Sequence, residues 1–143
     1  MAPEIMRNTN ERYSSYGPEV DYWAATVVLF SLATGRFPFI QDEKTNYTNS
    51  PQYAMISGCT TNSFGINTSK RPALNYIEKF WTSLNLPMTL SEDFKDFIGL
   101  MFSDSPSLRM TLTDMLSHPW MKGEVASQEE CQDEFTNRRQ CLE

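Results

Sequence analysis

Residues 21–35 read DYWAATVVLFSLATG, and this long apolar stretch is the feature that decides the fold. Its first residue, Asp21, can accept hydrogen bonds from the free amides at a helix N-terminus, and Gly35 suits the position just past a helix C-terminus. The β-branched run at 26–28 would also suit a buried strand, but the uninterrupted length and both end signals favour a helix. Apolar or small residues surround this helix on all sides, so we expect it to lie inside the fold.

Further helices are predicted downstream, which makes the expected fold mainly α-helical. Residues 53–56 can form one or two helical turns, and a longer helix should begin near Ser91, whose hydroxyl can cap it. The apolar side chains of that helix follow the spacing i, i+3, i+4 and i+7; they are Phe94, Phe97, Ile98 and Met101. Another helix should begin at Thr111, which forms a variant capping box with Asp114, and Pro119 stops it. Its apolar stripe consists of Leu112, Met115 and Leu116.

Composition excludes several classes of protein. The 143 residues include 12 Lys and Arg against 18 Asp and Glu, which gives a net charge of −6, and 40% of the residues are hydrophobic. This composition is ordinary for a globular protein. The chain is long enough to form one hydrophobic core, or a large piece of a bigger domain. The acidic balance argues against nucleic acid as a partner, because binding to phosphates needs clustered Lys and Arg.

Targeting signals are also missing from the sequence. The uncharged apolar stretch at 22–35 is too short to cross a bilayer core of roughly 30 Å, so we expect no membrane association. The first residues have neither the basic start nor the apolar centre of a signal peptide. Three widely spaced cysteines, Cys59, Cys131 and Cys141, fit reduced thiols and predict an intracellular, cytoplasmic protein.

Polar segments separate the predicted helices. Residues 1–17 are expected to form a loop or a frayed helix before a turn at 17–18. Residues 57–75 are polar and contain two glycines, which predicts a surface insertion. The charged tail at 123–143 should contain a solvated helix from Glu129 to Arg139.

Three stretches together carry a family resemblance. They are MAPEI at 1–5, the segment from Asp21 to GRFPF at 35–39, and LRMT at 108–111 continuing to LSHPW at 116–120. In order and spacing they resemble the C-terminal half of a eukaryotic protein kinase domain, from its Ala-Pro-Glu motif to its last helix. The resemblance covers residues 1–122, and it implies a mainly α fold: a kinase-like helical C-lobe with no N-lobe sheet in this chain. The Gly-x-x-Pro-Phe and His-Pro-Trp motifs resemble serine/threonine kinases of the calmodulin-dependent and related groups.

The resemblance assigns structural roles near the start of the chain. Glu4 matches the kinase glutamate that pairs with a buried arginine, here Arg109; alternatively the two are exposed charges that never meet. Asp21 matches the aspartate that begins the central helix and braces the catalytic loop, although a simple N-cap is a sufficient role for it. Trp23 is expected in the core under either interpretation.

His118 and Trp120 complete the set of residues to which the resemblance gives a structural role. His118 is the single histidine, and in the kinase interpretation it is a structural residue before Pro119. A general base or metal ligand is the alternative, but one histidine with no Cys or carboxylate cluster beside it makes no metal site.

The chemistry of a kinase has no counterpart in this sequence. Phosphoryl transfer needs a glycine-rich phosphate cover, a lysine, a catalytic aspartate, and an aspartate and asparagine for magnesium. The six glycines never occur as Gly-x-Gly, and neither His-Arg-Asp nor Asp-Phe-Gly is present. We therefore predict no catalytic, cofactor-binding or metal-binding residue in this chain, with ATP and Mg²⁺ bound by a longer parent. The chain is either a fragment without the upstream half or a protein that has lost catalysis.

Two regions allow both a structural and a functional interpretation. The aromatic residues Tyr76, Phe80 and Trp81 are more often core than recognition surface. The tail could be an autoregulatory helix or a solvated helix on the back of the lobe, and it lacks the basic amphipathic character of a calmodulin target.

Three hypotheses for the function follow. The first is part of a serine/threonine protein kinase, in which this segment supplies the helical scaffold and the peptide-docking side. Its partners would be a protein substrate and the missing N-lobe and catalytic loop. The second is a catalytically inactive, kinase-derived interaction module. The third is an unrelated helical bundle with chance motifs.

Overall fold

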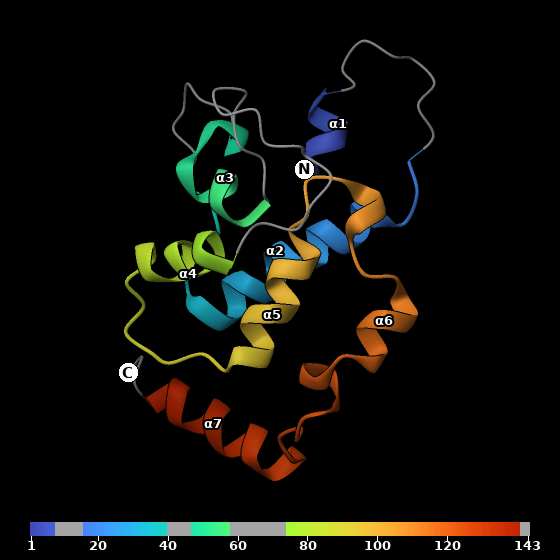
Figure 1. Cartoon of the computed structure of the whole chain (residues 1–143). Helices are drawn as coiled ribbons and strands as arrows, with labels where there is room; N and C mark the ends of the chain where they lie inside the picture. The colour runs from blue at the N-terminus through green and yellow to red at the C-terminus, as the bar shows by residue number, and fades with distance from the viewer. Residues whose placement is uncertain (8–15, 40–46, 58–73, 141–143) are drawn as a thin grey trace.

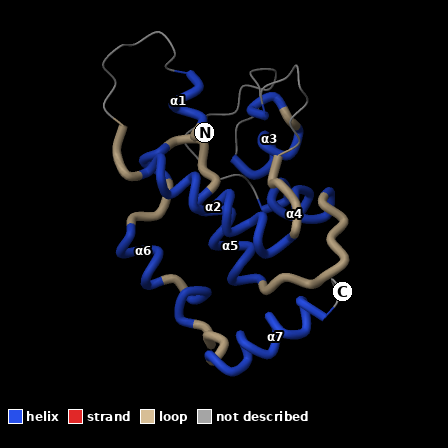
Figure 2. The backbone as a smooth tube through the Cα atoms, turned by 180° about the vertical axis from the view of Figure 1, so that it is seen from behind, coloured by secondary structure: helices blue, strands red, loops and turns tan. Residues whose placement is uncertain are grey.

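The computed structural model describes residues 1–7, 16–39, 47–57 and 74–140, and no strand occurs among them. Figure 1 shows the helices, and Figure 2 shows the same chain from behind. The α-helices are α1 (Pro3–Arg7), α2 (Glu19–Thr34), α3 (Pro51–Ser57), α4 (Leu74–Ser83), α5 (Glu92–Met101), α6 (Leu112–Ser117) and α7 (Gln128–Gln140). The described residues also form three short 3₁₀ helices, η1 (Tyr47–Asn49), η2 (Pro106–Leu108) and η3 (Pro119–Lys122). The mainly helical fold predicted from the sequence is confirmed.

The core is built from aromatic side chains on α2, α4 and α5. Trp23 and Phe30 of α2 are buried, and the Trp23 ring makes a T-shaped contact with Phe102, the residue after α5, at a centroid distance of 5.0 Å. Phe30 stacks on Trp81 of α4 at 5.8 Å, and the neighbouring Phe80 is fully buried. α2 therefore crosses the middle of the molecule against α5, as Figure 1 shows.

The predicted C-terminus of α2 is confirmed, and the predicted N-terminal cap is not. Gly35 adopts the left-handed conformation (φ 68°) and its N–H donates to the carbonyl of Ser31 at 2.9 Å, which confirms the predicted C-terminus. At the other end the helix begins at Glu19 behind Pro18, without a side-chain cap, so the prediction that Asp21 caps it is wrong. Asp21 lies exposed in the first turn, where its charge still favours the positive end of the helix dipole.

α2 is not enclosed on all sides, contrary to the prediction. Its buried residues form one stripe, namely Trp23, Thr26, Phe30 and Thr34. On the opposite side Val28 is 57% exposed and Leu32 is 81% exposed, and Phe37 beyond the helix is also exposed. The described part of the chain supplies packing partners for one side of this helix only.

The capping signals predicted at Ser91 and Thr111 are confirmed. The Ser91 hydroxyl accepts the Phe94 N–H at 3.2 Å, and the predicted stripe of α5 is buried. At α6, Thr111 Oγ1 accepts the Asp114 N–H at 3.2 Å and Asp114 Oδ2 accepts the Thr111 N–H at 3.1 Å, which closes the capping box. The apolar stripe of α6 is largely unburied, however: Leu112 and Leu116 are exposed and only Met115 packs against the core.

Other predictions divide between the described and the undescribed residues. The short helix expected at 53–56 is α3, and Phe80 belongs to the core with Trp81 packed against it. The side chain of Tyr76, the residues Cys59 and Cys141, and positions 58–73 of the predicted insertion lie outside the described residues. Every residue of α7 is exposed. Across the described ranges, no helix has the length and apolar character needed to cross a membrane.

Replacing Gly35 with alanine tests the left-handed helix end. No atom lies within 4 Å of the position that a Cβ would occupy, so steric overlap is absent and only the backbone conformation opposes the change. We expect the free energy of unfolding to fall by about 1 kcal/mol in urea titrations. The control is Gly35→Asn, because asparagine tolerates this conformation better and should lose less; equal losses would contradict the explanation.

Candidate functional site

Arg109 is the charged centre of the structure. It follows η2, and its side chain has no solvent-exposed surface. The guanidinium donates from Nη1 to Glu4 Oε1 and from Nη2 to Glu4 Oε2, each at 2.7 Å. This two-pronged geometry, with both charges largely out of water, gives short and strong charge-assisted hydrogen bonds. It fixes α1 to the segment between α5 and α6.

The remaining donors of Arg109 reach backbone carbonyls. Nη1 also donates to the carbonyl of Glu19 at 2.8 Å, and Nε donates to the carbonyl of Ser103 at 3.1 Å. The guanidinium carbon lies 4.9 Å from the centroid of the Trp23 ring, a favourable cation–π distance. One side chain therefore connects α1, the first turn of α2 and the loop after α5.

The electrostatics of Glu4 follow from this pairing. Burial disfavours the charged form, but the hydrogen bonds from Arg109 outweigh burial and hold the pKa of Glu4 below its ordinary value. The carboxylate of Asp104 opposes the lowering, which places a second acid near the pair. Asp104 in turn accepts a hydrogen bond from the hydroxyl of Tyr53 on α3. A second polar contact, between Asp104 and α3, thus lies near the ion pair.

A second cluster surrounds His118, between α6 and η3. Its Nδ1 accepts the backbone N–H of Trp120 at 3.2 Å, and its Nε2 lies 3.3 Å from Asp96 Oδ2 on α5. The ring stands edge-on to Phe97 at 5.2 Å, and Trp120 packs on Phe94 and Phe97 at 5.4 and 5.0 Å. These contacts attach the last turns of the lobe to α5.

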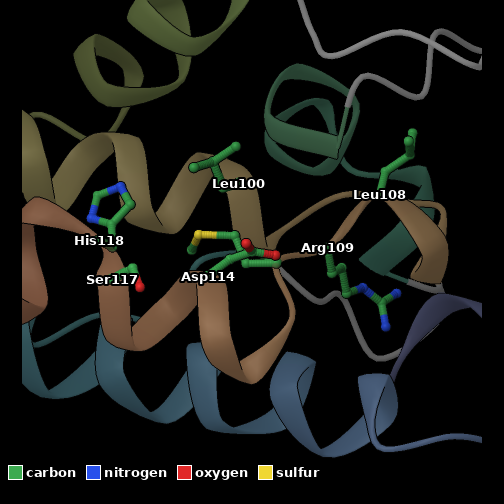
Figure 3. Close-up of a pocket in the computed structure, with 7 residues that line it drawn as sticks. Leu100, Leu108, Arg109, Asp114, Ser117 and His118 are labelled. Carbon is green, nitrogen blue, oxygen red and sulfur yellow. The ribbon is translucent and has the colours of Figure 1, made fainter.

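A cavity of about 370 Å³ lies between the two clusters (Figure 3). Its lining residues are Leu100, Leu108, Arg109, Met110, Asp114, Ser117 and His118. A carboxylate, a hydroxyl and an imidazole in one cavity resemble a catalytic set, but the Ser117 hydroxyl points away from the His118 ring. Asp114 is bound by Thr111, whose hydroxyl and backbone hydrogen bonds lower the pKa of that carboxylate. The arrangement does not activate a nucleophile.

The structure sorts the predicted residues into two groups. It brings Glu4, Arg109 and Trp23 into contact, and it separately brings together His118 and Trp120; Asp21 joins neither group. No set of three His, Cys, Asp or Glu side chains suitable for a metal occurs in the described ranges.

Several partners in these clusters were not found by sequence reasoning. The carbonyls of Glu19 and Ser103 leave no sequence signal, because every residue has a carbonyl. Asp96 lies 22 positions before His118, and no local sequence pattern connects the two.

Comparison with known proteins identifies related sequences. The family described as the protein kinase domain matches residues 1–121. Calcium-dependent protein kinase 22 of Oryza sativa subsp. japonica is 34% identical over 124 residues, which cover 85% of this chain and 16% of that protein. Calcium-dependent protein kinase 21 of Arabidopsis thaliana is 30% identical over 124 residues, covering 86% of this chain and 18% of the relative. Calcium/calmodulin-dependent protein kinase cmkA of Emericella nidulans is 29% identical over 126 residues, which cover 88% of this chain and 23% of that protein. The chain thus spans less than a quarter of the length of each of these relatives.

Replacing Arg109 with alanine should lower the free energy of unfolding by roughly 3–5 kcal/mol, because the charge of Glu4, whose side chain is 15% exposed, would lose its partner. The measurement is urea or thermal unfolding of the 143-residue chain. Arg138→Ala is the matched control: it breaks an equally short 2.7 Å pair with Glu134 on the exposed α7, and such pairs contribute about 1 kcal/mol or less. An Arg109→Ala melting temperature equal to that of the unmodified chain would contradict the structural role of the pair.

The lowered pKa of Glu4 predicts acid sensitivity. A carboxylate whose pKa is lower in the folded than in the unfolded state stabilises the fold above the unfolded-state pKa, about 4.3 for glutamate. This contribution is lost as the pH falls from there through the lower pKa of the folded state. Unfolding measured from pH 7 to pH 2 should therefore show a component that Glu4→Gln removes. An identical pH profile for the variant would refute the assignment.

Proposed function

Because this chain belongs to the protein kinase domain family, we propose that it is the helical-lobe part of a serine/threonine protein kinase. The parent protein would transfer the γ-phosphate of ATP, with Mg²⁺, to serine or threonine side chains of a protein substrate. The observation that carries the proposal is the family match over residues 1–121. The buried Glu4–Arg109 pair supports it, because the same chain segments are joined as the motif order implies.

The contribution of this segment is scaffolding rather than chemistry. The printed sequence contains no His-Arg-Asp, Asp-Phe-Gly or Gly-x-Gly motif, so no residue here is proposed to hold ATP or Mg²⁺. The elements that bind the nucleotide would lie elsewhere in the parent. A rigid helical base would hold those elements in the geometry that in-line transfer requires.

The exposed side of α2 is the proposed contact surface for those elements. Val28, Leu32 and Phe37 present apolar side chains to solvent, an arrangement that commonly marks an interaction site. Covering each of them would contribute about 1.5–3 kcal/mol of favourable burial. We propose that the catalytic loop and the rest of the kinase domain cover this side of α2.

The division of the chain and its location are part of the same proposal. Residues 1–122 would form the C-terminal part of the kinase domain, and 123–143 would form a charged tail. The fully exposed α7 supports this division. We propose an intracellular, cytoplasmic location, which is supported by the cysteine pattern of the sequence.

A catalytically inactive interaction module is the second candidate. The absence of the phosphoryl-transfer motifs from the printed sequence favours it. Such a module would bind a partner protein through the same exposed apolar side of α2. The coding sequence upstream of Met1 distinguishes the two candidates: in-frame His-Arg-Asp and Asp-Phe-Gly motifs support the kinase, and their absence supports the module.

The 143-residue chain alone should neither turn over ATP nor phosphorylate a peptide. The measurements are ATP hydrolysis and phosphate incorporation with Mg²⁺ present. Turnover above a buffer control that persists in repeated purifications would overturn our assignment of the catalytic elements to the rest of the parent.

Leu32→Glu tests the proposed contact surface. Because Leu32 is 81% exposed, the unfolding free energy of this chain should change by less than about 0.5 kcal/mol. In the parent protein the buried charge should reduce phosphoryl transfer strongly. The control is Val125→Glu, at a position that is 89% exposed beyond η3, and it should leave activity unchanged. Equal activity of the two parent variants would contradict the proposed contact.

A further inference from the structure

The two ring nitrogens of His118 face partners of opposite hydrogen-bonding character. Nδ1 accepts the backbone N–H of Trp120, and Nε2 lies within hydrogen-bonding distance of the Asp96 carboxylate. A neutral imidazole has one donor and one acceptor, so the tautomer with hydrogen on Nε2 satisfies both contacts at once. We infer this tautomer from the partners of the ring.

The hydrogen bond to Nδ1 holds the start of η3. That helix begins with Pro119, which has no N–H, so the amide of Trp120 is the first that needs an acceptor. His118 supplies the acceptor from a ring that is 7% exposed, so water has little access to replace it. The indole ring of the same residue, Trp120, packs on Phe94 and Phe97 of α5. Loss of this hydrogen bond would therefore weaken the packing of Trp120 against α5.

We propose that His118 is a proton-sensitive cap that releases η3 and Trp120 when its ring becomes protonated. An imidazolium carries hydrogen on both nitrogens, and the new hydrogen on Nδ1 would point at the Trp120 N–H, so two donors would face each other. The cap is therefore closed when the ring is neutral and opens when the ring carries a second proton.

The charged groups around the ring act in different directions. Asp96 of α5 favours the protonated ring, and it can keep its contact with Nε2 in both states. Asp114 of α6 and Arg109 line the same cavity, and the charge of Arg109 is matched by Glu4. From η3, the contact with the ring that the structure shows is the backbone N–H of Trp120. Protonation would therefore break the hydrogen bond from Trp120 to His118 and keep the contact between His118 and Asp96 on α5.

Nuclear magnetic resonance of the full chain can test this directly, because His118 is the single histidine and its ring signals need no assignment by mutation. The neutral ring should show hydrogen on Nε2. Once the ring is protonated, the protection factor of the Trp120 amide, taken against the unstructured exchange rate at the same pH, should fall at least about tenfold with the same midpoint. A neutral ring with hydrogen on Nδ1 would overturn the proposal. A Trp120 amide that ignores the ring titration would overturn it as well.

Two variants separate the cap from the carboxylate contact. His118→Asn places an amide oxygen near the position of Nδ1 and does not titrate, so the Trp120 amide should stay protected across the pH range. Asp96→Asn removes the charge and keeps an acceptor for the Nε2 hydrogen, so the step should remain. A step that persists in His118→Asn would assign it to another group. Glu4→Gln should leave the change at the Trp120 amide as it is in the unmodified chain. If a variant does not fold, the measurement on the unmodified chain still tests the proposal.

Discussion

The contact between Glu4 and Arg109 is the constraint on which the remaining structure depends. It joins residues 105 positions apart, and the same guanidinium reaches the backbone at Glu19 and Ser103. A buried cation is costly without compensation, and here hydrogen bonds and the carboxylate supply it. The segments that it joins are short: α1 has five residues and η2 has three. Such short helices are marginal in isolation, so their positions depend on this side chain.

The central helix illustrates how a sequence can imply a larger assembly. Residues 21–35 are apolar on every side, yet the structure buries one stripe of α2 and leaves Val28 and Leu32 in solvent. The apolar pattern is therefore more extensive than the described core requires. A second covering layer would account for the excess, which is why we assign this side to the rest of a kinase domain.

The sequence predicted the local features better than the environment of each helix. Ser91, Thr111 and Gly35 define helix ends through chemistry that lies within a few positions, and all three act as predicted. Asp21 was misplaced because the helix starts two residues earlier without a side-chain cap. The family motifs led to the pairing of Glu4 with Arg109, whereas its carbonyl partners and Asp96 arise from tertiary packing, which a single sequence does not encode locally.

The polar clusters around Arg109 and His118 attach peripheral segments of the lobe, and the aromatic core packs between α2, α4 and α5. The rings of Trp23 and Phe30 each pack on Phe102, and this apolar burial does not itself depend on the charge of His118 or Glu4. Arg109 secures one margin through α1 and η2, and His118 secures the other through η3. Local opening at either margin can then occur at lower free energy than global unfolding.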